Sequence, residues 1–179
     1  VHSDLDDQLY DSYQMKLLNV GSCGLHILHN AFRSAAHELI GVESYLKSIH
    51  TLFDDTSARR EDFVRIVGDS VPVCQFALPF CSHRWLENVN VAKRGIDMFE
   101  SVKLFVDAVE KKEVKNPKTK SFEQVQLLVQ DKLLVTRLEF FVALAGPIER
   151  FLQMYQTDKP MLVFVASDLQ KLMMSYLEK

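Results

Sequence analysis

The sequence predicts a mainly α-helical protein with one short strand. Of its 179 residues, 47% are apolar, so the chain can bury a core without disulfides or metals. In most segments the apolar residues recur every three or four positions, the spacing that places them on one face of a helix. The exception is an apolar run over 16–20 that ends at Gly21, a pattern typical of a buried strand.

Helical spacing predicts four helices in the first part of the chain. Ser22 is a suitable N-cap for the second, and Gly41 ends it. The polar segment 54–57 separates the third from the fourth. The predicted ranges are 5–16, 23–39, 42–53 and 57–67.

The segment 68–81 has no helical period and contains Gly68, Pro72 and Pro79, which predicts a crossing loop. Helical spacing returns afterwards, interrupted by a basic turn over 111–120. Ser121 is the expected cap of the helix that follows the turn, and Gly146-Pro147 predicts a kink or break in the longest helix. The predicted ranges are 85–114, 121–130, 132–156 and a last helix from 159 to the end.

Charge and cysteine content restrict the function classes. Lys and Arg number 21 against 24 Asp and Glu, a net charge of −3, so any nucleic-acid contact is expected through a local patch. Three cysteines form no disulfide framework. The acidic start is not a signal peptide, and no apolar run approaches the roughly 20 residues of a membrane span. We therefore expect an excerpt of a longer intracellular protein, nuclear or cytoplasmic, that is neither secreted nor membrane-bound.

Cys23, His26 and His29 are spaced three residues apart, so one helix face would carry a thiol and two imidazoles. Such a face could ligate zinc if a fourth ligand came from Cys74, Cys81 or His83. Paired CxxC knuckles are absent, however, and small thiols commonly pack as apolar groups. Core packing is therefore the favoured interpretation, and no metal is assigned.

Arg84 and the only tryptophan, Trp85, begin the helix after the loop. An indole can stack on an unpaired base while the guanidinium holds a phosphate. The alternative is that Trp85 anchors the helix start in the core. Arg59 and Arg60 form a second basic cluster, which is either solvated surface or a DNA-backbone contact.

The order of these motifs carries a family resemblance. The segments 16–32, 54–63 and 78–85 together resemble the central region of hAT-superfamily transposase-like proteins. Cys23 and His26 match the family's Cys-x-x-His motif, and Arg84 and Trp85 match its Arg-Trp pair, which is placed near the transposon end. The resemblance covers most of the chain.

The resemblance implies a partial ribonuclease-H-like core over 1–67, a crossing loop over 68–84 and an all-α insertion domain over 85–179. It also implies that the full-length enzyme cuts and joins DNA with Mg or Mn held by two Asp and one Glu. Asp4 is only a marginal match to the second Asp, and the other two carboxylates would lie outside this chain. We assign no catalytic residue and no cofactor here.

Three functions remain open. The first is an inactive fragment of an hAT-like transposase that retains at most binding to transposon ends through Arg84, Trp85, Arg59 and Arg60. The second is a domesticated helical module whose apolar surfaces, such as 161–177, bind another protein. Helical surfaces would also allow a homo-oligomer. The third is a small zinc-binding domain.

Overall fold

The computed structural model describes residues 10–14, 24–54, 56–68, 76–156 and 162–178, and these ranges contain helices and connecting segments but no strand. The mainly α class is therefore confirmed. The predicted strand over 16–20 and the cap Ser22 lie outside the described residues. The elements are α2 (Gly24–Ala36), α3 (Val42–Asp54), α4 (Ser57–Val67), the 3-10 helix η2 (Trp85–Asn88), α5 (Val89–Asp97), α6 (Phe99–Glu110), α7 (Lys120–Leu128), α8 (Leu134–Tyr155) and α9 (Leu162–Leu177).

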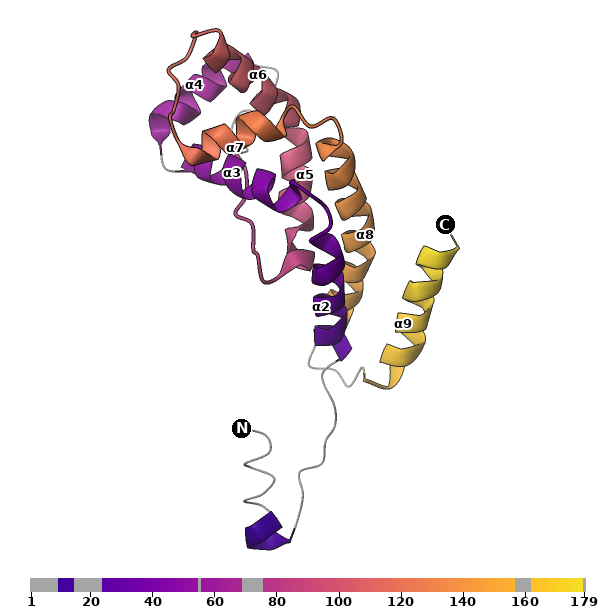
Figure 1. Cartoon of the computed structure of the whole chain (residues 1–179). Coiled ribbons are helices and arrows are strands. Elements are labelled where there is room, and N and C mark those ends of the chain that lie inside the picture. The colour runs from indigo at the N-terminus through magenta and orange to yellow at the C-terminus, as the bar shows by residue number, and fades with distance from the viewer. Residues whose placement is uncertain (1–9, 15–23, 55, 69–75, 157–161, 179) are drawn as a thin grey trace.

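Packing joins helices that are far apart in the sequence (Figure 1). Helix α3 packs on α7 and α5, and α4 packs on α6. Helix α5 runs along α8, while α2 contacts both η2 and α8. Buried side chains from before and after the 68–84 segment belong to one core. Helices on either side of the predicted boundary at 68–84 therefore pack together. The division into a ribonuclease-H-like core and an insertion domain stays a prediction.

Helix α3 illustrates how the apolar spacing produces this core. Its preceding residue, Gly41, has a φ of +87°, a left-handed conformation that glycine adopts without a Cβ penalty. The helix then buries one complete face, as the spacing predicted. The buried residues are Val42, Tyr45, Leu46, Ile49, Leu52 and Phe53.

Helices α3 and α5 approach each other closely at Gly95. A Cβ at this position would lie 2.4 Å from Leu46 Cδ2, so only glycine fits without a shift of the buried leucine. The Tyr45 hydroxyl also donates a hydrogen bond to the Gly95 carbonyl, at 3.3 Å. Because α3 and α5 lie so close together, α5 can pack against α8 with its other side.

Aromatic rings hold together the end of the molecule where α3, α4, α6 and α7 meet. Phe105 of α6 has its ring centroid 5.6 Å from Phe53, 5.9 Å from Phe63 and 6.4 Å from Phe122. Phe53 and Phe63 lie 4.6 Å apart. Tilted and edge-to-face contacts at these separations add to the free energy gained by burial.

The predicted helix over 85–114 is wrong as one unit, because the structure divides it into η2, α5 and α6. The break is at Met98, which is buried between α5 and α6. Helix α5 packs mainly on α8, whereas α6 packs on α4. One straight helix could not reach both partners, so tertiary packing overrides the local helical pattern.

Two other predicted boundaries differ from the structure. The cap of α7 is Thr119 rather than Ser121, and the Thr119 side chain accepts a hydrogen bond from the Phe122 N–H. Helix α8 does not break at Pro147 but continues through it. Gly146 favours this continuity, because it lacks the Cβ with which the proline ring normally clashes, although Pro147 still donates no hydrogen bond to the preceding turn.

Candidate functional site

The structure brings together two motifs that lie more than fifty residues apart in the sequence. Helix α2, which carries His26 and His29, packs against η2, which begins at Trp85. Just beyond α2, the ring of His37 meets the indole edge to face at 5.1 Å. The turn that begins with Arg84 is therefore placed beside the helix of the Cys-x-x-His motif.

Asn88 fixes the shape of this turn. Its side-chain oxygen accepts a hydrogen bond from the Cys81 N–H at 2.8 Å. Its amide group donates to the carbonyls of Cys81, Arg84 and Trp85 at 2.9–3.1 Å. A buried amide bonded on all sides holds the backbone in one conformation, so Asn88 determines how Arg84 and Trp85 are presented.

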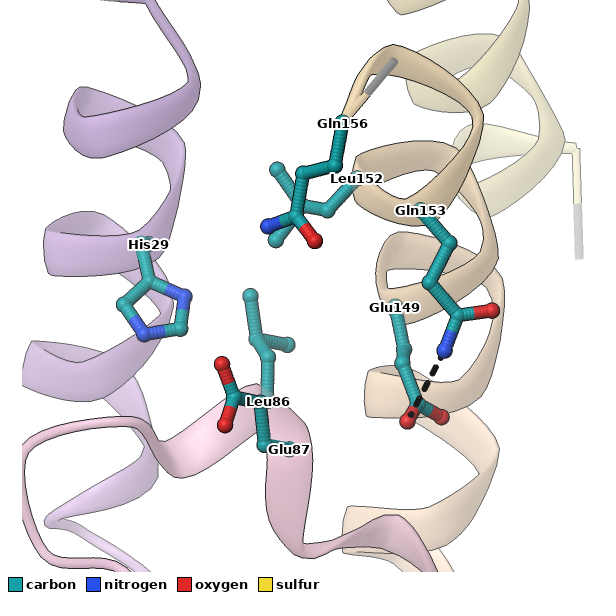
Figure 2. A pocket seen from close by; sticks show the side chains of 7 residues that line it. All are labelled: His29, Leu86, Glu87, Glu149, Leu152, Gln153 and Gln156. Atoms are coloured by element: carbon teal, nitrogen blue, oxygen red, sulfur yellow. Dashed lines mark hydrogen bonds between the residues drawn. The ribbon is translucent and has the colours of Figure 1, made fainter.

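A pocket of about 170 Å³ lies where α2, η2 and the end of α8 converge. Figure 2 shows His29 pointing into it from α2, with Glu87 approaching from η2 and Gln156 from α8. Glu149 accepts a hydrogen bond from Gln153, at 3.4 Å, on the α8 side. The lining residues are His29, Leu86, Glu87, Glu149, Leu152, Gln153 and Gln156.

The charge in this pocket is unfavourable for phosphate. It holds the carboxylates of Glu87 and Glu149, and the last turn of α8 has no basic residue to offset its carbonyl end. Burial lowers the pKa of His29, although Glu87 acts in the opposite direction. With neutral His29, the pocket suits a cationic or amide group better than an anion.

The structure buries Trp85, which is 1% exposed. Its ring packs against His37, Phe80 and Phe141 with centroid distances of 5.1–6.0 Å. In this conformation the indole has no free face on which a base could stack. The geometry corresponds to the alternative in which Trp85 anchors the start of the helix in the core. Its Nε1 is the buried side-chain polar atom without a hydrogen-bond partner in the described part of the chain.

Arg59 and Arg60 bind the carbonyl end of α3. Arg59 donates to the Leu52 carbonyl at 2.9 Å, and Arg60 donates to the Phe53 carbonyl. Arg60 also pairs with Asp54 at 3.2 Å. Two guanidinium groups at a helix C-terminus satisfy its last carbonyls and its dipole. Arg84 is exposed and pairs with Glu87, also at 3.2 Å.

The candidate metal ligands are not gathered into a cluster in the described residues. Cys23 and Cys74 lie outside those residues, and His26 is exposed on α2. The thiol of Cys81 lies 3.6 Å from His83 Nε2. No group of three or more His, Cys, Asp or Glu side chains within the described ranges is arranged to hold a metal.

Helix α9 lies in the apolar segment 161–177, which the sequence indicated as an interaction surface without showing which side of the helix is exposed. One face of α9 packs against the core through Val165, Leu169, Leu172 and Tyr176. The Tyr176 hydroxyl donates to the Leu144 carbonyl at 2.5 Å, and Tyr155 of α8 donates to Asp168 at 2.8 Å. The outward face stays exposed and consists of Val163, Ala166, Gln170, Met173, Met174 and Leu177.

Changing the pH is expected to loosen α9 from α8 at both extremes. Hydrogen bonds from Lys171 and Tyr155 hold the pKa of Asp168 below its ordinary 3.8. This stabilisation is present above that value and is lost as the pH falls through the lowered pKa. Burial and Asp168 raise the pKa of Tyr155 from 10 to about 12, so its contribution is present below pH 10 and lost as the pH rises through 12.

The measurement is hydrogen exchange of the α9 amides across pH, with the α3 amides as the internal standard. The Asp168→Asn variant is the control, because it removes the carboxylate that titrates on the acid side. An α9 whose protection follows that of α3 at every pH would contradict the expected coupling.

Comparison of the chain with protein-family models, curated proteins and solved structures gave no match. The hAT resemblance therefore depends on the sequence motifs alone. None of the helices in the described ranges combines the length and the apolar character of a membrane-spanning segment. What the geometry defines is a helical bundle with a small polar pocket beside η2 and an exposed, largely apolar face on α9.

Sequence reasoning missed Asn88, Glu87 and Glu149. Asn88 follows Trp85 by three residues and forms four side-chain hydrogen bonds. A lone asparagine at a helix start does not reveal such bonds in the sequence. Glu87 and Glu149 come from η2 and α8, whose proximity depends on tertiary packing. The Arg84-Trp85 motif and the helix face with His26 and His29 were the sequence signals for this region.

Proposed function

We propose that this chain is the central helical region of an hAT-like protein that acts by binding another protein, and that the outward face of α9 is the binding surface. The observation that carries the proposal is the exposure of its apolar side chains. Val163 is 79% exposed, Met173 58% and Leu177 77%. An exposed helix face that is apolar apart from Gln170 is typical of a protein-interaction site.

The geometry around the other candidates favours protein over DNA as the partner. Arg59 and Arg60 already bind carbonyls of α3, and the pocket beside Arg84 carries two carboxylates. Phosphate binding requires free cationic groups. Binding of transposon ends through Arg84 and Trp85 stays the second proposal, and it would require Trp85 to leave the core.

Within this proposal, 1–67 corresponds to a partial ribonuclease-H-like core segment, and 85–179 corresponds to the insertion domain. The family's Mg or Mn does not fit the residues present, since no ligand group is assembled in the described ranges. The zinc alternative stays a prediction, since its candidate ligands Cys23 and Cys74 lie outside the described residues. No catalytic step is derived for this chain.

Site-specific photo-crosslinking tests the proposal. A photoreactive phenylalanine analogue at Met173, in the full chain expressed in cells of the source organism, is expected to form an adduct with a polypeptide. The same analogue at Leu104, 51% exposed on α6, is the control and is expected to form none. Adducts with nucleic acid alone, or none from Met173, would refute a protein-binding role for α9.

The adduct must also depend on the apolar character of the face. Adding Leu177→Glu to the Met173 probe is expected to abolish the adduct while circular dichroism remains unchanged, because a carboxylate at a 77% exposed position disrupts an apolar contact without disturbing the core. An adduct that survives this change would show that another surface captures the partner.

A further inference from the structure

Five of the exposed residues of α9 are spaced as in a heptad repeat. Val163, Ala166, Gln170, Met173 and Leu177 are spaced three, four, three and four residues apart, and all five are exposed. This is the a/d spacing with which one helix packs along another. We refer to these five residues as the α9 seam.

The seam is accessible while α9 stays on α8. At about 100° per residue, its centre is turned roughly 120° around the helix from the side chains that pack on the core. The charged side chains of α9, Asp168 and Lys171, lie on other sides of the helix and pair with each other at 2.9 Å. The seam itself carries no charge, so two copies could meet there without electrostatic repulsion.

Gln170, in the middle of the seam, identifies the occupant. A carboxamide both donates and accepts hydrogen bonds. Against an apolar partner helix this group would lose water without replacement, which is unfavourable. Against Gln170 of a second copy, each amide can donate to the carbonyl of the other, and this pairing occurs when the two helices run parallel and in register.

We propose that the α9 seam binds the α9 seam of a second copy of this chain as a parallel pair, with its register fixed by the two Gln170 side chains. This inference rests on the proposed function of α9 as a protein-binding surface. The seam spans about 22 Å, which is short for a specific interface, so we expect a weak dimer with a Kd on the order of 10–100 µM.

Sedimentation equilibrium of the full chain tests the dimer by charge exchange at position 170. The Gln170→Glu and Gln170→Lys variants alone are each expected to weaken dimerisation about tenfold or more, because like charges would face each other. Mixing the two variants is expected to restore it. Ser175→Glu adds a charge on another face of α9 and is expected to leave dimerisation unchanged, and circular dichroism checks that each variant is folded.

A wild-type chain that stays monomeric well above that concentration range would overturn the inference, as would variants that dimerise like the wild type. Variants that dimerise poorly and are not rescued by mixing would overturn the in-register pairing. The crosslinking experiment distinguishes a failure of the proposed dimer from a failure of the proposed protein-binding function. A monomeric chain whose Met173 probe captures a different protein retains a protein-binding α9, whereas no protein adduct removes both proposals.

Discussion

Replacing Trp85 with alanine is expected to lower the free energy of unfolding by about 3–5 kcal/mol. The indole is 1% exposed and fills the space between His37, Phe80 and Phe141. Removing it leaves a cavity that the surrounding helices cannot fill completely. Urea denaturation monitored by circular dichroism measures the loss as a lower midpoint with an unchanged slope.

Trp85→Phe is the matched control. Because Trp85 Nε1 has no hydrogen-bond partner, phenylalanine loses volume but no hydrogen bond, and we expect a cost of only about 1–2 kcal/mol. The opposite pattern would be an unchanged stability of Trp85→Ala together with weaker binding to branched DNA ends. That result would place the indole at a DNA-binding surface and contradict its role as a core anchor.

Replacing Phe105 with alanine is expected to destabilise the chain by a comparable amount, about 3–5 kcal/mol. Phe105 is fully buried and contacts Phe53, Phe63 and Phe122. These residues belong to α3, α4 and α7, so the substitution weakens three helix contacts of α6 at once. Thermal or urea unfolding measures the effect.

The neighbouring Leu104 provides the control for Phe105. It is on the same helix but 51% exposed, so Leu104→Ala is expected to change the free energy of unfolding by no more than about 0.5 kcal/mol. Equal effects of the two substitutions would mean that the aromatic cluster does not hold this end of the molecule together.

The sequence predicted those helices whose limits are set locally. Helices α3 and α4 begin at Val42 and Ser57 as expected, because each has a clear apolar face or a polar break before it. The cap of α7 was misplaced by two residues, since Thr119 and Ser121 are equally suitable by type and only the geometry decides between them. The division at Met98 was not predictable, because it arises from the different partners of α5 and α6.

Less of the candidate site could be predicted. Arg84 and Trp85 were identified as a motif, but their environment depends on Asn88 and on the approach of α2. Arg59 and Arg60 are indistinguishable in sequence from a solvated basic cluster, although the structure uses them as caps of α3. The exposed face of α9 was visible only as a generally apolar segment, because apolar residues on both sides of a helix do not show which side is covered.

The pairing of α3 with α7 has a consequence for synthesis on the ribosome. The buried face of α3 is complete at Phe53, but its partner α7 ends at Leu128. At about 5–20 residues per second, roughly 4–15 s pass between the synthesis of the two. During that interval the part of the apolar face of α3 that α7 covers stays exposed on the nascent chain, so α3 is where we expect a chaperone to bind the growing polypeptide.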